Sequence, residues 1–402
     1  MTSEWNHFAL GEITELVIDY RGKTPKKLGG DWCKQGYRAL SAKNIKTGRI
    51  VQAETIRYID ESLYRKWMKD EVQRGDILIT SEAPFGQIFF WDSDEKIVLS
   101  QRLFCVRIKP EYDARFIYYY MTTPEFQSEL DGRATGTTVI GLRQPELMKC
   151  IIRCPEIQEQ KVIAAILSSI DAKIIANEKV NDNLYAQAKA TTKQWISKST
   201  GDYELLPLSN IASINPDTYS PKETWKYVNY LDTSSITEGC IAEIQHITPS
   251  SEKLPSRARR KIAPNDIVFS TVRPNQRHYG IISEPLPNML GSTGFAVIRS
   301  KNPLVCNELI YLCLTENEFI EKMQQLAEQS ASTFPAIKPS DLGVCEIPCP
   351  KDQSSTSFTE TLKSLFALIA ANQRENISLS EIRDVLLPKL MSGEIDVSDI
   401  QL

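Results

Sequence analysis

The chain has 402 residues, too many for one ordinary hydrophobic core, since domains usually hold about 100–200 residues. Its hydrophobic fraction of 42% and charged fraction of 24% are those of a globular protein, which excludes extended disorder and collagen-like repetition. The formal net charge of −4 excludes a general attraction to nucleic acid or acidic membranes, and only three histidines are available for catalysis or metal binding.

The sequence lacks the marks of a membrane or secreted protein. No stretch approaches the roughly 18 consecutive apolar residues that span a bilayer, and residues 1–7 lack the basic start and apolar core of a signal peptide. Nine cysteines form an odd set without the spacing of a disulfide framework. We therefore expect reduced thiols, a cytoplasmic location and no membrane partner.

Residues 1–155 form the first of two expected globular regions. They are rich in Gly, Pro and short β-type runs such as residues 76–80, and helical patterns such as residues 114–121 interrupt these runs. Such alternation predicts a mixed α/β domain dominated by strands.

Residues 156–200 contain neither Gly nor Pro and predict one long helix. A seam with alternating spacings of four and three residues is typical of a coiled coil, although the helix could instead pack on its own globular region alone. The seam residues are Ile163, Leu167, Ile170, Ile174, Asn177, Asn181, Leu184, Ala188, Thr191 and Trp195.

Residues 201–350 repeat the first region at an offset of about 190–195 residues, which indicates a tandem duplication. The landmarks keep the same order along both halves. They include Gly75-Asp76-Ile77-Leu78 with Asn265-Asp266-Ile267-Val268, Phe104-Cys105-Val106-Arg107 with Phe295-Ala296-Val297-Ile298, and Cys150-x-x-x-Cys154-Pro155 with Cys345-x-x-x-Cys349-Pro350.

Residues 351–402 supply a second long helix and a C-terminal tail. The seam residues of this helix are Phe358, Leu362, Leu365, Ile369, Asn372, Asn376, Leu379, Arg383, Leu386 and Leu390. The predicted fold class is therefore α+β: two similar mixed α/β domains joined by two long antiparallel coiled-coil helices, in a pseudo-twofold tandem repeat.

Asparagines occupy equivalent places on the two predicted seams. Asn177 and Asn181 match Asn372 and Asn376, and Asn177 is the midpoint of residues 156–198. Two related helices that cross antiparallel would bring these amides together at the centre. A polar residue on a seam lowers stability but fixes register, so we assign a register role to all four.

The motifs of common enzymes are missing. There is no G-x-x-x-x-G-K-[ST] loop, no G-x-G-x-x-G, no G-x-S-x-G elbow and no H-E-x-x-H helix, so we assign no catalytic and no cofactor-binding residue. Residues 215–218, Asn-Pro-Asp-Thr, lack the second proline and the aromatic residue of the amino-methyltransferase motif and favour a turn. The repeated Cys-x-x-x-Cys pairs have no nearby histidine and favour small buried residues over a metal site.

Basic and polar side chains gather in the Gly- and Pro-rich loops of both globular regions. Arg, Asn and Gln can bond to base edges, while Lys and hydroxyl groups bind phosphates. A single basic run is more often a solvated loop. Residues 1–155 carry 23 basic against 21 acidic side chains and residues 200–349 carry 13 against 17, which argues against tight DNA binding by this chain alone. The candidate DNA-binding residues are Lys23, Lys26, Lys27, Lys43, Lys46, Arg133, Thr135, Thr137, Arg143, Arg257, Arg259, Arg260, Arg273, Asn275, Gln276 and Arg277.

Three segments resemble the specificity subunit of type I restriction–modification enzymes. Residues 155–163, Pro-Glu-Ile-Gln-Glu-Gln-Lys-Val-Ile, resemble the family's Pro-x-x-x-Glu-Gln-x-x-Ile helix start, and residues 386–395 resemble its C-terminal signature. Gly75-Asp76-Ile77-Leu78 resembles an element found inside each target-recognition domain. The second helix starts at residue 351 without the Glu-Gln pair, so its first turn is expected to differ.

The resemblance implies a non-catalytic DNA-recognition subunit. Residues 1–155 and 201–350 would be target-recognition domains that each read one half of a bipartite, asymmetric site in double-stranded DNA. Residues 156–200 would be the first conserved spacer helix, and residues 351–402 the second with the tail. Two modification subunits, which methylate adenine, and restriction/translocase subunits would dock on this chain. S-adenosylmethionine, ATP and Mg would belong to those partners, and this chain would bind no cofactor.

Two alternatives come from other classes of protein. A self-contained DNA methyltransferase with degenerate motifs would bind S-adenosylmethionine as an isolated chain. A two-lobed scaffold that binds proteins would fail to retard DNA even with its partners present.

Overall fold

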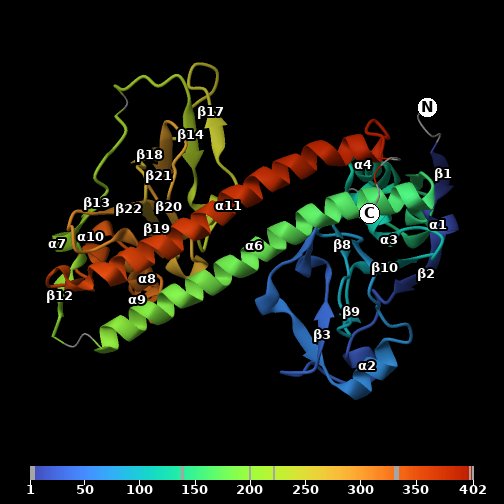
Figure 1. Ribbon diagram of the computed structural model, residues 1–402. Helices are drawn as coiled ribbons and strands as arrows, with labels where there is room; N and C mark the ends of the chain where they lie inside the picture. Colours follow the sequence, from blue (N-terminus) through green and yellow to red (C-terminus); the bar gives the residue numbers. More distant parts are fainter. Residues whose placement is uncertain are drawn as a thin grey trace. The chain divides into compact units, whose positions relative to one another are not determined.

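The computed structural model describes residues 5–136, 140–198, 201–220, 222–329, 335–397 and 400. The chain forms two compact units: unit 1 comprises residues 1–175 and 377–402, and unit 2 comprises residues 176–376. The boundary between them crosses both long helices, so each helix contributes one part to each unit (Figure 1). None of the helices in the described ranges is both long and apolar enough to cross a membrane.

Unit 1 is built on a four-stranded antiparallel sheet in the order β2-β10-β7-β8. A second sheet has the order β6-β3-β9, and two small pairs join β1 to β11 and β4 to β5. The strands are β1 (Asn6–Ala9), β2 (Thr14–Asp19), β3 (Tyr37–Leu40), β4 (Ile45–Lys46), β5 (Arg49–Ile50), β6 (Arg57–Ile59), β7 (Ile77–Thr80), β8 (Ile88–Phe90), β9 (Val98–Leu99), β10 (Leu103–Ile108) and β11 (Ile151–Cys154).

Three α-helices of unit 1 begin at side chains that accept hydrogen bonds from their first turns. Asp113 accepts from Phe116 N–H at the start of α3, and Thr123 accepts from Phe126 N–H at the start of α4. The helical segments are α1 (Leu10–Ile13), η1 (Lys26–Leu28), η2 (Ala42–Asn44), η3 (Ala53–Thr55), α2 (Glu61–Trp67), α3 (Ala114–Thr122), α4 (Pro124–Arg133) and α5 (Gln144–Leu147).

Strand β7 explains why the four-stranded sheet lies between two layers. Successive side chains of a strand face opposite sides, so an unbroken apolar run needs a core on each side. Ile77 and Ile79 pack in the core that contains α3, whereas Leu78 packs in the core that contains α2 and the second sheet. The sheet therefore has α3 on one face and the second sheet with α2 on the other.

Unit 2 repeats most of these elements in the same order, but a strand, β18, stands where unit 1 has the helix α2. Its sheets have the orders β13-β22-β19-β20 and β17-β14-β21-β18, with the pairs β12–β23 and β15–β16. The strands are β12 (Tyr203–Pro207), β13 (Ala212–Ile214), β14 (Val228–Leu231), β15 (Ile236–Thr237), β16 (Cys240–Ile241), β17 (Gln245–Ile247), β18 (Ala258–Lys261), β19 (Asp266–Ser270), β20 (Tyr279–Ile282), β21 (Met289–Ser292), β22 (Phe295–Ser300) and β23 (Glu346–Pro350). The helical segments are α7 (Leu208–Ile211), η4 (Thr233–Ser235), η5 (Pro274–Gln276), α8 (Asn307–Leu314), α9 (Asn317–Glu328) and α10 (Pro339–Gly343).

One landmark of the repeat was predicted one residue out of register. Phe104 packs in the core with α3, as Ala296 packs in the core with α8, whereas Phe295 packs on the opposite face of its sheet. Phe104 therefore corresponds to Ala296, and its predicted match to Phe295 is wrong. A shift of one residue moves a side chain to the other face of a strand, so the similarity of two rings was misleading. The corrected register matches Arg107 with Arg299.

The long helices α6 (Ile157–Lys198) and α11 (Thr356–Met391) pair antiparallel within each unit. In unit 1, Asp171 of α6 contacts Arg383 of α11. In unit 2, Asn181 contacts Asn372, and Trp195 stacks on Phe358. Later positions on α6 thus meet earlier positions on α11. All seam residues predicted from the sequence are buried or half-buried.

The seams also pack against the globular parts. Ile163 and Leu167 join the core of unit 1 beside α3, while Ala188 and Leu362 join the core of unit 2 beside α8. The helices therefore pack both on each other and on the sheets' helical layers. The predicted fold class, with repeated mixed α/β domains and two long antiparallel helices, is confirmed. The domain boundaries at residues 155, 200 and 350 stay predictions.

The two helix starts differ, as the sequence suggests. Gln160 of the Glu-Gln pair is buried at 2% exposure; its side chain donates to Pro155 O (2.8 Å) and accepts from Asp113 N–H (2.9 Å). These bonds fasten the first turn of α6 to the start of α3. The second helix lacks this glutamine and is preceded by a 3-10 turn, η6 (Gln353–Ser355).

Candidate nucleic-acid interface

The first basic segment lies between β2 and β3 and is only partly available to a ligand. The Lys23 ammonium donates to Trp67 O (2.6 Å) and lies 3.7 Å from the centre of the Tyr20 ring. Burial lowers the pKa of Lys23. Lys26 and Lys27 are exposed. Lys23 therefore secures this turn, and the other two lysines are its exposed cations.

Lys43 lies in η2, just before the β4–β5 hairpin, and Lys46 ends β4; both are exposed. The turn of this hairpin is bonded to the loop between β7 and β8. Thr47 donates from its N–H (3.0 Å) and its hydroxyl (3.3 Å) to the Gln87 side-chain oxygen. Lys46 is therefore held beside the end of the β7–β8 loop.

The third basic segment of unit 1 follows α4. Arg133 is engaged by Glu129 at 2.7 Å, whereas Thr135 and Arg143 are exposed. Leu142 N–H donates to Ser81 O (3.0 Å), which joins this segment to the start of the β7–β8 loop. The candidate Thr137 lies outside the described residues.

Unit 2 presents its first basic group along the edge strand β18. Arg257 is exposed, and Thr293 N–H donates to its carbonyl oxygen (2.8 Å). Arg259 is half-buried and its Nε donates to Ser256 O (3.2 Å). Arg260 is half-buried, its Nε has no hydrogen-bond partner in the described part of the chain, and burial lowers its pKa. Arg257 is thus the most accessible of the three candidates.

The remaining candidates form the loop between β19 and β20. Arg273, Asn275 and Gln276 are exposed, while Arg277 is half-buried. The Arg277 guanidinium donates to Glu238 (3.0 Å) on the β15–β16 hairpin and to the Asn317 side-chain oxygen (2.8 Å) at the start of α9. The structure therefore gathers four candidates on one loop, but only three of them are directed to solvent.

The β7–β8 and β19–β20 loops share one framework. Ala83 and Arg273 both adopt left-handed backbone angles, with φ of +43° and +47°, and each precedes a proline. Ser81 N–H donates to Arg102 O (2.9 Å), just as Thr271 N–H donates to Gly294 O (2.8 Å). The loops differ in what they expose, because Ala83-Pro84 in one corresponds to an Arg-x-Asn-Gln segment in the other. The framework is duplicated and its exposed side chains are not.

A buried ion pair beside each loop strand is repeated in both units. Arg107 bonds bidentately to Asp76 (2.9 Å for each bond), and Arg299 bonds bidentately to Asp266 (2.7 and 2.9 Å). The carboxylate raises the pKa of each arginine. The sequence landmarks include both aspartates and Arg107 but miss Arg299, because the register of β10 against β22 was one residue out.

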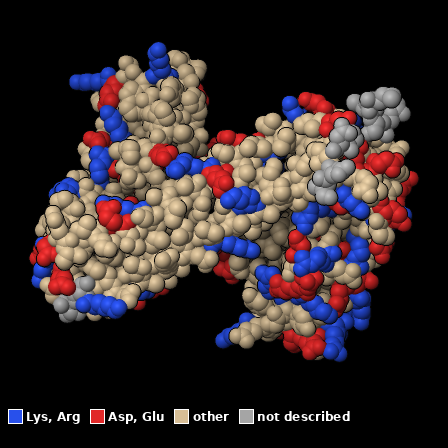
Figure 2. Space-filling model, in the orientation of Figure 1, with Lys and Arg blue, Asp and Glu red and all other residues tan. Residues whose placement is uncertain are grey.

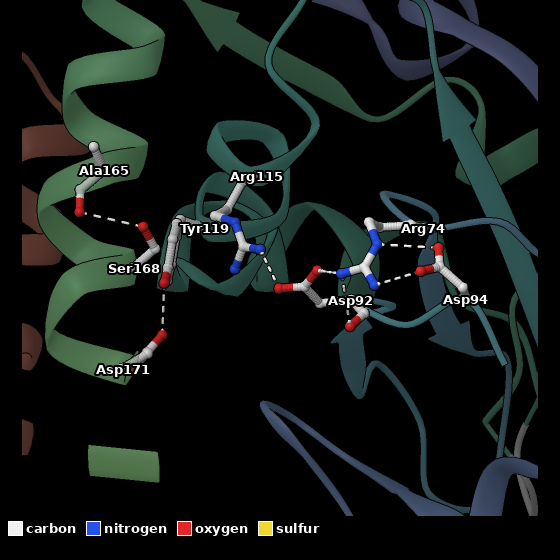
Figure 3. A network of polar contacts seen from close by, with 8 residues as sticks. All are labelled: Arg74, Asp92, Asp94, Arg115, Tyr119, Ala165, Ser168 and Asp171. Atoms are coloured by element: carbon white, nitrogen blue, oxygen red, sulfur yellow. Dashed lines mark hydrogen bonds and ion pairs between the residues drawn. The ribbon is translucent and has the colours of Figure 1, made fainter. Parts of the chain in front are cut away.

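A polar network in unit 1 fixes α3 against its surroundings (Figure 3). Arg115 donates to Asp92 (2.7 Å), which also pairs with Arg74, and Arg74 reaches Asp94 at 2.8 Å. Burial alone would raise the pKa of Asp92, but the bonds from the two arginines outweigh it and lower this pKa.

The same network reaches the long helix α6 through a tyrosine. On α3, Tyr119 donates to Asp171 of α6 (2.6 Å), which also pairs with Arg383 (Figure 3). Burial and the neighbouring carboxylate raise the pKa of Tyr119. These contacts hold α3 against α6.

The four register asparagines meet in two pairs within unit 2. Asn177 donates to the Asn376 side-chain oxygen (2.8 Å) and to Glu375 (2.7 Å). Asn372 donates to the Asn181 side-chain oxygen (2.8 Å). The structure thus brings together the predicted partners from α6 and α11, and their role in register stays a prediction.

Neither surface charge nor metal-binding residues indicate a further site in the described part of the chain. Basic and acidic side chains are interspersed over the face seen in Figure 2. Within the described ranges, no three His, Cys, Asp or Glu side chains are grouped so that they could hold a metal ion. Burial raises the pKa of the Cys150 and Cys154 thiols to about 12, which disfavours the thiolate that binds metals.

Comparison with known proteins shows similarity to one family. A family model for the type I restriction modification DNA specificity domain matches residues 2–185, slightly less than half of the chain. The MjaIX specificity subunit of Methanocaldococcus jannaschii is 24% identical over 350 residues, which is 81% of this chain and 79% of that protein. The putative MjaX specificity subunit of the same organism is 23% identical over 419 residues, covering 98% and 94% of the two chains. The chain is therefore similar to type I specificity subunits over most of its length.

Further specificity subunits match over different lengths. The MjaVIII subunit of M. jannaschii is 28% identical over 187 residues, and this match spans 45% of the present chain and 43% of that protein. The crystal structure of the S subunit from M. genitalium shares the fold, with a TM-score of 0.57 over 96% of both chains at 17% identity. The relatives are named specificity subunits, and the predicted non-catalytic role is confirmed.

Proposed function

We propose that this specificity subunit reads a bipartite, asymmetric site in double-stranded DNA, with one half-site for each globular part. The observation that carries the proposal is the duplicated loop framework with different exposed side chains. Equivalent loops on equivalent sheets would approach DNA in the same way, because the flanking strands and bonds are the same. Different side chains on those loops would then select different bases.

The two loops offer contrasting chemistry to a base pair. The unit 2 loop exposes Arg273, Asn275 and Gln276, which carry the groups that bond to guanine and adenine edges in the major groove. The unit 1 loop exposes Ala83 and Pro84, and its end is bonded to Thr47, the residue after the exposed Lys46. A half-site read by unit 1 would therefore depend more on apolar and phosphate contacts.

The helices α6 and α11 would serve as the spacer between the half-sites. Helix α6 runs without interruption for 42 residues, from unit 1 into unit 2, so no loop separates the two globular parts on this side. The paired asparagines in unit 2 offer a defined register for α11 along it.

Two modification subunits and restriction/translocase subunits are the proposed protein partners. The modest charge of −4 supports this, because phosphate contacts dominate DNA affinity and partners would supply many of them. S-adenosylmethionine, ATP and Mg would be bound by those partners. A cytoplasmic location would follow from this association.

An exchange of recognition regions tests the proposal. Residues 201–350 are replaced by the corresponding region of the MjaIX subunit. The chimera is then combined with the modification subunit that works with the present chain. The methylated site should change in one half and keep the other half. A change in both halves, or in neither, would contradict separate reading by the two parts. Binding of S-adenosylmethionine by the purified chain would instead favour a self-contained methyltransferase.

A further inference from the structure

The β19–β20 loop of unit 2 is held at both ends by bonds to neighbouring elements. At its start, Arg273 N–H donates to Pro335 O (2.9 Å). In its middle, Asn275 N–H donates to the Gln324 side-chain oxygen of α9 (3.3 Å). At its end, His278 Nδ1 bonds to Ile236 O (2.7 Å) on the β15–β16 hairpin. The loop is therefore clamped between a hairpin and a helix.

Arg277 is the side chain that joins these two supports. One terminal nitrogen donates to Glu238 of the hairpin (3.0 Å) and the other donates to Asn317 of α9 (2.8 Å). The main chain adds a bond, since Glu238 N–H donates to Arg277 O (2.9 Å). An arginine that reads guanine presents both terminal donors as a fork to one base edge. Arg277 would have to leave both protein acceptors before it could do so.

The neighbouring side chains of the loop are placed differently. Arg273, Asn275 and Gln276 are exposed. In the described part of the chain, the side-chain amides of Asn275 and Gln276 form no hydrogen bond, so their donors and acceptors remain available to a ligand. A bound ligand would meet these groups without breaking the clamp.

Unit 1 also ties the end of its equivalent loop to its hairpin, one position beyond the place of Arg277, since the strand registers match Gln87 with His278. Gln87 lies just before β8, and its side-chain oxygen accepts two bonds from Thr47 in the turn of the β4–β5 hairpin. A side-chain tie from the loop end to the hairpin is thus present in both units, although the residues differ. This recurrence favours a supporting role for the tie, because a side chain bonded to the hairpin is not available to a base.

We propose that Arg277 is a positioning residue and that Arg273, Asn275 and Gln276 are the base-reading side chains of unit 2. The inference rests on the proposed function. It divides four residues of similar chemistry into one that holds the loop and three that specify sequence. Sequence composition alone places all four in the same class.

A charge exchange separates holding from reading. The complex of this chain with its modification subunit is used to select duplexes from a library with randomised sequence. Arg277→Glu would face Glu238 and displace the loop, so the selected site should bind about 10-fold or more weakly. Combining Arg277→Glu with Glu238→Arg rebuilds the ion pair in reverse. This double variant should recover most of the affinity and select the wild-type sequence.

Matched variants provide the contrast. Asn275→Ala and Gln276→Ala leave the clamp intact and should each relax the choice at one base pair of a single half-site, with unchanged thermal stability. The inference is overturned if the exchanged double variant stays as weak as Arg277→Glu, or if it selects a different base. It is also overturned if neither alanine variant nor Arg273→Ala alters the selected sequence. A wild-type complex that selects no sequence at all would overturn the proposed function itself.

Discussion

Buried ion pairs are the most regular feature of the repeat at the scale of single residues. Asp76 is 1% exposed, and it accepts two bonds from Arg107 and one from Gln73 N–H (2.8 Å). Both carboxylate oxygens that burial removes from water are thereby hydrogen-bonded. Removing one partner leaves the other charge in a poorly solvated place, which costs more than the pair contributes.

The first prediction concerns this pair. Asp76→Asn should lower the free energy of unfolding of unit 1 by about 2–4 kcal/mol, because Arg107 loses its carboxylate while remaining mostly buried. Denaturant titration followed by circular dichroism measures the change. Glu61→Gln is the matched control, since its pair with Arg65 is exposed and should be worth less than about 0.5 kcal/mol. Equal losses in the two variants would contradict the assignment.

The second prediction concerns alkaline pH. Burial raises the pKa of Tyr118 to about 12, and raises that of its repeat partner Tyr311 well above the ordinary value. Both hydroxyls lie near a hairpin glycine, so ionisation would place charge inside the core. The neutral hydroxyl stabilises the fold fully below about pH 10, which is the pKa of tyrosine in the unfolded chain. This stabilisation is lost as the pH rises toward 12.

Absorbance of tyrosinate and circular dichroism, recorded together between pH 9 and 12.5, test this expectation. A part of the tyrosine signal should appear only as the fold is lost. Tyr118→Phe should reduce the loss of stability between about pH 10 and 12 while leaving stability at pH 8 nearly unchanged. Complete ionisation near pH 10 with an intact fold would contradict the burial of these hydroxyls.

Residue-scale features were only partly predictable from the sequence. The aspartates 76 and 266 stand out because they recur in a fixed motif. Their arginine partners require the register of two strands that lie about thirty residues away, and one misplaced landmark hides the match. Sequence also cannot separate Arg277 from Arg273, since only the structure shows that Arg277 is half-buried and Arg273 exposed.

At the scale of elements, a polar layer on the seam is the feature to test. The amides of Asn181 and Asn372 bond to each other, so each has a hydrogen-bond partner on the seam. Elsewhere the repeat replaces polar contacts by apolar ones: Asp171 and Arg383 of unit 1 correspond to Phe366 and Ala188 of unit 2. The seam therefore tolerates both chemistries, provided that the partners match.

The third prediction follows from this pairing. Asn372→Leu alone should lower the free energy of unfolding by about 1 kcal/mol, because Asn181 loses its bond to the Asn372 amide. Adding Asn181→Leu should recover that loss or exceed it, since two leucines pack well on a seam that specifies register at the expense of stability. A double-mutant cycle from thermal unfolding gives the coupling energy. Losses that simply add would show that the two amides do not act as a pair.

Whole elements were easier to predict than single contacts. A run without Gly or Pro and a four-three seam suffice to predict a long helix, and α6 follows those limits closely. Helix α11 starts at Thr356, later than the start expected at residue 351, and continues through Pro388 to Met391. The parallel pairing of β3 with β9, and of β14 with β21, was beyond the sequence. These strands are far apart along the chain, and they pair because their side chains pack in a shared core.

At the scale of the whole molecule, the duplication and the continuity of the long helices lead to a prediction about spacing. The unit boundary crosses α6 after residue 175 and α11 after residue 376. Seven residues inserted at both points would keep the seam in phase and lengthen each helix by about 10 Å. That length is close to three base pairs, which also turn the duplex by nearly a third of a revolution.

The fourth prediction is that this paired insertion abolishes binding at the natural spacing. A coiled coil rotates far less over one heptad than DNA does over three base pairs, so one recognition part would face the wrong side of the groove. Retardation of duplexes with spacers lengthened in single steps measures the effect, and recovery at a longer spacer should be weak. An insertion in α6 alone serves as a control for disrupted helix pairing. Unchanged binding at the natural spacing would show that the helices do not set it.

One measurement tests most directly whether this chain determines the DNA sequence at which a modification enzyme methylates. Adenine methylation is mapped across the host genome in cells with the chain, without it, and with the Gln276→Ala variant. The account predicts methylation at bipartite, asymmetric sites that disappears without the chain, and a variant that relaxes one half-site while the other stays fixed. Methylation that persists at the same sites in the absence of the chain would contradict it.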